Sequence, residues 1–190
     1  MKQPKPKTKS KMGASARRKG VAFERALALM FRDAMPGIPV RRGLQYQDGA
    51  GCPDVMVPGL WVEGKANKRC NIRMAYRQAV DDSSKRGGTL RPCVVTKEDR
   101  DPPLVTMQER DLRDYLGGSY NYPDLGCLEL CEHPYTHGAM VPVKRRMEEL
   151  ITQGSGQFLR WNDDGEPPMM ATMYLSDFLQ AISNSPRGGL

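Results

Sequence analysis

The apolar positions in the first half of the chain follow two kinds of spacing, one typical of helices and one typical of strands. Residues 20–35 and 71–86 have the spacing of amphipathic helices, and each segment stops at a glycine-containing turn. Short apolar runs typical of strands form residues 38–46, 54–57, 60–66 and 92–97. The predicted order of helix, three strands, helix and strand implies an α/β (α+β) protein whose mixed sheet is covered on both faces.

The second half has a weaker pattern. After a predicted strand and helix in residues 103–116, we expect the following elements: a strand in 126–133, a helix in 141–153, strands in 156–161 and 169–175, and a helix in 176–183. This order repeats the one after Trp61 at an offset of 66 residues, which aligns Thr106 with Thr172. The second half is therefore either a degenerate copy of half the first or an unrelated α/β extension.

The net charge of +7 is concentrated in two segments. Residues 1–19 hold eight Lys or Arg and no acid, and residues 65–91 hold eight basic and two acidic residues. We expect residues 1–19 to be a disordered basic tail because they are rich in Lys, Pro and Ser. Two basic segments indicate an anionic partner, of which nucleic acid is the commonest.

Charged residues interrupt two of the predicted strands. Asp54 opens one, and Glu63 and Lys65 lie on one face of the next, since side chains alternate along a strand. A hairpin at Pro58-Gly59 would bring Asp54 beside Glu63 and create a site for a hard divalent cation such as Mg²⁺. Such an ion lowers the pKa of a bound water, and Lys65 would orient that water or stabilise charge on a phosphate.

This arrangement resembles the PD-(D/E)xK nuclease superfamily in Pro53-Asp54 and Glu63-Gly64-Lys65. Its core has the order of elements predicted above for residues 20–97. "RRKGVAFERALA", "GCPDV" and "WVEGKA" look most like Holliday junction resolvases of the archaeal type. Phage recombination nucleases and the restriction-like VRR-NUC group are close alternatives. The resemblance implies a restriction-endonuclease-like core in residues 20–118, followed by a C-terminal extension in residues 119–190.

The resemblance further implies metal-dependent hydrolysis of DNA that leaves a 5′-phosphate. Asp54, Glu63 and the Gly64 carbonyl would hold Mg²⁺, with Mn²⁺ as a substitute, and Lys65 would position water. Glu24 and Gln78, from the helices before and after, would assist. No small-molecule cofactor is expected. Nuclease action on other DNA and DNA binding without catalysis stay open as alternatives.

We expect a basic track to bind the DNA backbone without reading its sequence. Its residues are Arg17, Arg18, Lys19, Arg41, Arg42, Lys68, Arg69, Arg73, Arg77, Lys85 and Arg86. Symmetric cutting of a branched junction would require a homodimer.

Five scattered cysteines favour a reducing, intracellular setting, and no apolar run is long enough for a membrane span. We therefore expect a cytoplasmic protein of a bacterial or phage-infected cell. A zinc site is a weaker possibility, formed by Cys127, Cys131, His133 and His137.

Overall fold

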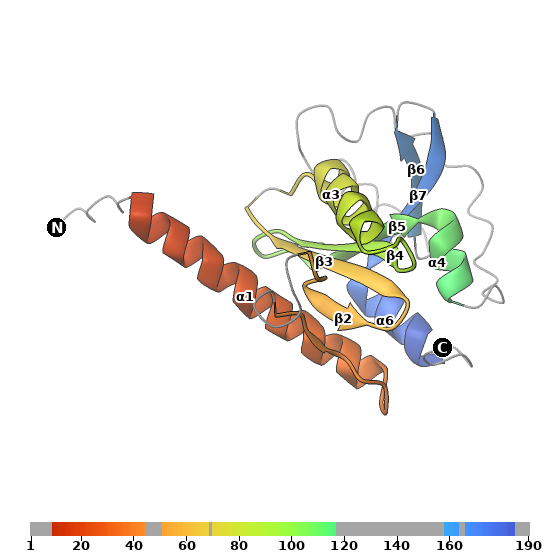
Figure 1. The fold of residues 1–190 in the computed structure, drawn as a ribbon, viewed down its shortest axis with the longest axis horizontal. Coiled ribbons are helices and arrows are strands. Elements are labelled where there is room, and N and C mark those ends of the chain that lie inside the picture. The colour runs from red at the N-terminus through yellow and green to blue at the C-terminus, as the bar shows by residue number, and fades with distance from the viewer. Residues whose placement is uncertain (1–8, 45–50, 69, 117–157, 164–165, 185–190) are drawn as a thin grey trace.

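The computed structural model describes residues 9–44, 51–68, 70–116, 158–163 and 166–184 (Figure 1). Its helices are α1 (Lys9–Ala34), α3 (Ile72–Lys85), α4 (Glu109–Tyr115) and α6 (Leu175–Asn184). Its strands are β1 (Arg41–Arg42), β2 (Val55–Val57), β3 (Leu60–Ala66), β4 (Arg91–Lys97), β5 (Leu104–Gln108), β6 (Phe158–Asp163) and β7 (Glu166–Tyr174). None of the described helices is long and apolar enough to cross a membrane.

The strands form one mixed sheet in the order β1-β2-β3-β4-β5-β7-β6. β3 and β4 are parallel, with Glu63 opposite Val94, and the other neighbouring strands are antiparallel. Helix α3 connects the two parallel strands, as a parallel pair requires a crossover. The predicted mixed sheet, and the predicted order of elements in residues 20–97, are therefore confirmed.

The helices cover both faces of the sheet (Figure 1). Phe23 and Leu27 of α1 share a buried cluster with Val62 of β3. Ile72 and Ala79 of α3 belong to a second cluster, which contains Trp61. Because side chains alternate along β3, Glu63 and Lys65 lie on the face that carries Trp61 and α3.

Local signals set both ends of α3. The Asn71 side chain caps its start by accepting a hydrogen bond of 3.1 Å from the Met74 backbone N–H. Gly87 and Gly88 follow its end with φ values of 96° and 65°, a region that favours glycine. The helix therefore begins and stops where the sequence predicts.

Helix α1 begins earlier than expected. The prediction that residues 1–19 lack regular structure is wrong for residues 9–19, which form the first turns of α1. No proline follows Pro6 before Pro36, and this stretch contains Ala, Lys, Arg and Met, which favour helices. The basic segment is thus a helical extension that projects from the body of the protein (Figure 1).

The C-terminal strands extend the sheet beyond β5. β5 pairs with β7 so that Thr106 lies opposite Thr172, and their hydroxyl oxygens are 2.9 Å apart. β4-β5-α4 and β6-β7-α6 are each a hairpin followed by a helix, in the order expected of a repeat. The rest of the proposed repeat, in residues 126–157, lies outside the described residues, so the duplication stays a hypothesis.

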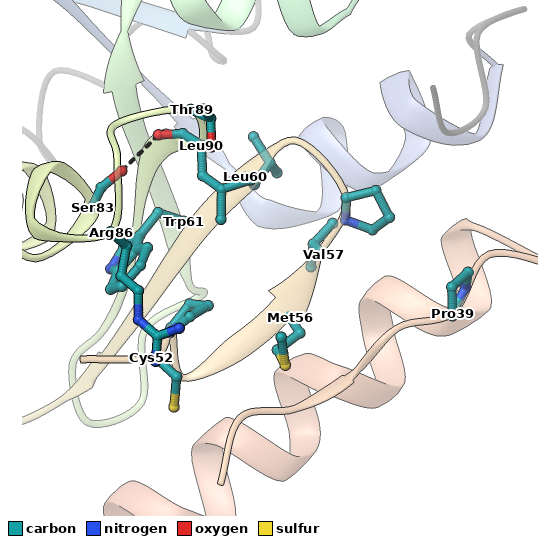
Figure 2. Close-up of a pocket in the computed structure, with 12 residues that line it drawn as sticks. Pro39, Cys52, Met56, Val57, Leu60, Trp61, Ser83, Arg86, Thr89 and Leu90 are labelled. Carbon is teal, nitrogen blue, oxygen red and sulfur yellow. Dashed lines mark hydrogen bonds between the residues drawn. The ribbon is translucent and has the colours of Figure 1, made fainter. Parts of the chain in front are cut away.

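A cavity of about 480 Å³ lies over the β2–β3 hairpin (Figure 2). Trp61 and Met56 form part of its wall, and Arg86 and Leu90 reach it from the segment between α3 and β4. The Ser83 hydroxyl donates a hydrogen bond of 2.8 Å to the Leu90 carbonyl and so ties this segment to α3.

Candidate active site

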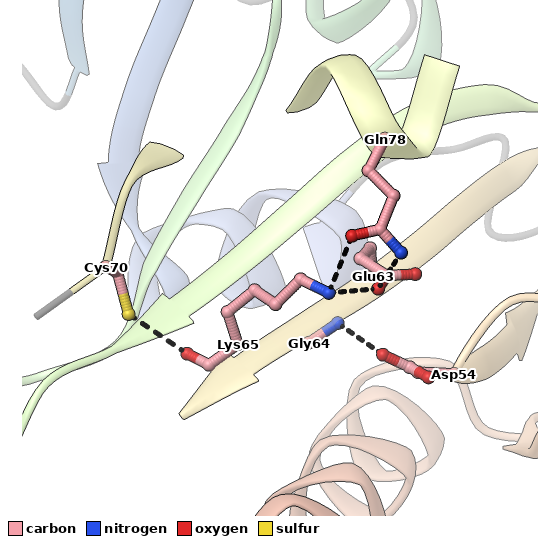
Figure 3. A network of polar contacts seen from close by, with 6 residues as sticks. All are labelled: Asp54, Glu63, Gly64, Lys65, Cys70 and Gln78. Carbon is pink, nitrogen blue, oxygen red and sulfur yellow. Dashed lines mark hydrogen bonds and ion pairs between the residues drawn. The ribbon is translucent and has the colours of Figure 1, made fainter. Parts of the chain in front are cut away.

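Asp54 is fixed against β3 by two hydrogen bonds, of which Figure 3 shows the one from Gly64. Its backbone N–H donates to the Val62 carbonyl at 2.9 Å. Its carboxylate atom Oδ2 accepts the Gly64 N–H, also at 2.9 Å. The β2–β3 hairpin therefore holds the Asp54 carboxylate beside the Glu63-Gly64-Lys65 segment, as the sequence predicts.

Glu63, Lys65 and Gln78 form a connected polar group (Figure 3). Lys65 Nζ lies 2.5 Å from Glu63 Oε1 and donates to Gln78 Oε1 at 3.1 Å. Gln78 Nε2 donates to the same Glu63 oxygen at 3.4 Å. Helix α3 thus contributes Gln78 to the site, and Glu63 is buried with only 7% of its surface exposed.

Gly64 allows α1 to approach the site closely. A Cβ atom at this position would lie 3.1 Å from Leu27 Cδ1 and 3.5 Å from Phe23 Cδ1. The 3.1 Å contact is tighter than most Cβ contacts, so a side chain at this position would require Leu27 to move by a few tenths of an ångström. The same close packing brings Glu24, on the turn of α1 between Phe23 and Leu27, toward Asp54.

The electrostatic environment of Asp54 disfavours its charged form. Burial and the neighbouring Glu63 carboxylate raise the pKa of Asp54 to about 7, and Glu24 contributes in the same direction. The Gly64 N–H and Lys65 oppose this shift. The site therefore gathers three acidic groups, an excess of negative charge that a cation would relieve.

Glu24 is held by Arg42 on the rim of a cleft of about 380 Å³. Arg42 Nε lies 2.6 Å from Glu24 Oε2 in a half-buried ion pair. Arg17 and Asp54 also line this cleft. Sequence reasoning placed Arg42 in the DNA track and Glu24 in the site, but the two are 18 residues apart and no motif signals their pairing.

The oxygen donors fit a hard divalent cation. Asp54 and Glu63 have carboxylates, and the backbone carbonyl of Gly64, the residue after Glu63 on β3, would be the third donor. Within the described ranges, no three His, Cys, Asp or Glu side chains are grouped closely enough to hold a metal ion. The candidate set of two carboxylates and one carbonyl depends on the backbone for its third ligand.

The predicted DNA-binding residues fall on three surfaces. Arg17, Arg18 and Lys19 lie on α1, where Lys19 forms an ion pair with Asp99. Arg41 and Arg42 form β1. Arg17 and Arg42 are therefore close to the acidic site, whereas Lys19 is engaged with the loop after β4.

The remaining basic residues follow β3 or lie on and after α3. Arg73 and Arg77 are on α3, and Lys85, at its last turn, pairs with Asp82 at 2.8 Å. Arg86 lines the cavity of Figure 2. Lys68 is exposed after β3, while Arg69 lies outside the described residues. The basic helix thus shares a face of the sheet with Glu63 and Lys65, whereas Glu24 reaches the site from α1 on the other face.

The candidate zinc ligands Cys127, Cys131, His133 and His137 all lie outside the described residues. That prediction is untested.

Comparison with known proteins gives no assignment. No protein-family model matches the chain, and no significant match was found among curated proteins or solved structures. The evidence for function therefore consists of the residues that the fold brings together around Asp54.

Proposed function

We propose that this protein is a metal-dependent DNA endonuclease with a restriction-endonuclease-like core of the PD-(D/E)xK type. The observation that carries the proposal is the convergence of four side chains. Asp54 lies against the Gly64 N–H, and Lys65 lies between Glu63 and Gln78. These residues come from two strands and a helix, so their proximity is a product of the fold.

In this proposal, Asp54, Glu63 and the Gly64 carbonyl would hold Mg²⁺ or Mn²⁺. When bound, such an ion would supply a Lewis acid for the phosphate and lower the pKa of a water molecule. Lys65, kept in place by Glu63 and Gln78, positions the attacking water and stabilises negative charge on the phosphate. The water oxygen bonds to phosphorus, the bond to the 3′ oxygen breaks, and the products carry a 5′-phosphate and a 3′-hydroxyl.

We further propose that the substrate is branched DNA of the Holliday junction type, cut by a homodimer. The support is indirect. The basic surface of α3 suits the phosphate backbone, and nothing in the sequence resembles a base-reading helix. A two-fold dimer would place two sites for paired symmetric cuts.

The test is cleavage of a synthetic four-way junction, compared with linear duplex and with single-stranded DNA. Each substrate is incubated with Mg²⁺, with Mn²⁺ and with EDTA. The variants Asp54→Asn and Lys65→Ala are matched with Met74→Ala, an exposed α3 residue that is outside the polar group.

Paired nicks on the junction, lost in EDTA and in the first two variants but kept in Met74→Ala, are expected. Equal cutting of linear duplex would retain the nuclease and remove the junction specificity. Tight DNA binding without cutting under either metal would show that the protein is a binding protein with the same fold.

A further inference from the structure

The cavity of Figure 2 adjoins the acidic site. Trp61, in its wall, is two residues before Glu63 on the same face of β3, a distance of about 7 Å along a strand. Met56 of β2, also in the wall, is two residues after Asp54. Cys52 and Pro53 line both this cavity and the cleft that contains Glu24 and Asp54. The two hollows therefore share a wall beside the carboxylates.

The walls of the cavity are mainly apolar, with polar groups toward α3. Met56, Val57, Leu60 and Leu90 supply apolar surface. Arg86 and Thr89, both exposed, add a guanidinium group and a hydroxyl. In Figure 2 the Arg86 side chain extends over the cavity toward Cys52.

Trp61 adds the surface of an indole ring to the cavity wall. Its Nε1 atom is buried away from the cavity, so the ring contributes apolar contact rather than a hydrogen bond to an occupant. The cavity thus combines apolar walls with the cation of Arg86.

We propose that this cavity receives one unpaired nucleobase of the DNA strand whose phosphate lies at Asp54 and Glu63; the inference rests on the proposed nuclease function. A nucleobase has flat apolar faces, which match the apolar walls. The neighbouring phosphates of the same strand match Arg86. The separation of Trp61 from Glu63 is comparable to the length of one extended nucleotide.

Such a pocket would make the enzyme selective for DNA structure. In a regular duplex each base is paired and stacked, and extruding it costs free energy that a mismatched or already unpaired base does not require. A strand with an unpaired base next to the cut would fill the pocket without that cost. Selectivity for bulged or branched DNA would then arise without any reading of sequence.

The experiment compares two duplexes that differ only in one base. One carries a single bulged adenosine, and the other carries an abasic residue at the same bulge. Several such pairs are made, each with the bulge at a different position along the strand. Dissociation constants are measured in EDTA, and cleavage rates in Mg²⁺. The protein variants are Thr89→Trp, which fills the cavity from an exposed loop, and Ser84→Trp, an equally bulky change on the exposed surface of α3 outside the cavity wall.

The wild type is expected to bind the bulged adenosine about tenfold more tightly than the abasic bulge, the range found when one base is packed in a protein pocket. Thr89→Trp should remove this preference, and Ser84→Trp should retain it. Binding of the abasic duplex should be the same in all three proteins.

A ratio near one between the wild type's dissociation constants for the abasic and the adenosine bulge would overturn the pocket. An equal loss of preference in both tryptophan variants would do the same. Metal-dependent cleavage with no preference would leave the nuclease intact and remove only this inference. A preference in binding with no cleavage of any DNA would retain the pocket and overturn the nuclease.

Discussion

The fold raises the pKa of the Asp54 carboxyl group to near neutral pH. Burial and two neighbouring carboxylates raise its pKa to about 7, more than the Gly64 N–H and Lys65 lower it. The folded protein therefore holds a proton there at pH values at which the unfolded chain, with an ordinary aspartate, has lost it. The contribution of Asp54 to stability is favourable below the ordinary pKa and declines as pH rises toward 7.

Replacement of Asp54 by Asn should therefore change stability in a pH-dependent way. At pH 8 the variant avoids a buried charge among acids, and we expect its free energy of unfolding to exceed that of the wild type by about 1–2 kcal/mol. At pH 3, where Asp54 is protonated in both the folded and the unfolded chain, the two should be nearly equal. Urea denaturation at the two pH values measures this. A variant that is less stable at pH 8 would contradict the charge repulsion.

Divalent metal should stabilise the wild type more at high pH. A cation competes with the proton on Asp54, so binding tightens as pH rises through about 7. The melting temperature in excess Mg²⁺ should exceed that in EDTA by more at pH 8 than at pH 6. Asp54→Asn should show little metal effect at either pH. Equal stabilisation of both proteins would place the metal elsewhere.

In the proposed mechanism, Gln78 acts through its neighbours. It contacts Lys65 at 3.1 Å and Glu63 at 3.4 Å, so it orients both without being a proposed metal ligand. Gln78→Ala should lower Mg²⁺-dependent cleavage about tenfold, as loss of such supporting contacts does in metal sites. Its kcat should fall more than its DNA affinity. Loss of affinity alone would make Gln78 a DNA contact.

At the scale of elements, sequence patterns predict the parts that depend on local signals. The β2–β3 hairpin follows from alternation and from Pro58-Gly59, and α3 follows from its helical spacing and from the glycines after its end. The Glu24–Arg42 ion pair depends on how α1 packs beside β1, which no local pattern contains. The helical start of α1 was missed because a lysine- and serine-rich composition was taken to indicate disorder.

The contact between α1 and β3 can be tested with two glycines. Gly64→Ala should destabilise the protein by about 1–2 kcal/mol because its Cβ would lie 3.1 Å from the buried Leu27 side chain. Gly13→Ala should instead increase helix content and stability slightly, since nothing lies within 4 Å and alanine favours a helix interior. Circular dichroism and denaturation measure both.

These outcomes separate two claims about α1. A neutral Gly64→Ala would show that α1 is not closely packed at the site. No gain in helix content in Gly13→Ala would show that the basic segment is not helical in solution.

At the scale of the whole molecule, the charged groups of the candidate site gather at one end of the sheet. The β1–β4 end carries the carboxylates, the cavity and the basic helix α3, while β5, β7 and β6 extend the sheet away from them. Helix α6 packs with α1 on the face of the sheet opposite α3. There the ring of Phe178 packs edge-on against the ring of Phe31 of α1, with 6.2 Å between the ring centroids. The C-terminal elements thus stabilise the helix that carries Glu24.

This division predicts which arginines contribute to DNA affinity. Arg73 and Arg77 lie on the helix that also carries Gln78, on the face of the sheet with Glu63 and Lys65. Each phosphate contact releases counterions, so Arg73→Gln with Arg77→Gln should reduce the slope of log K against log salt by about 2. The matched pair Arg110→Gln with Arg113→Gln removes the same charge from α4 and should leave the slope unchanged. Equal slopes for both doubly substituted proteins would mean that net charge, rather than the surface around the carboxylates, attracts DNA.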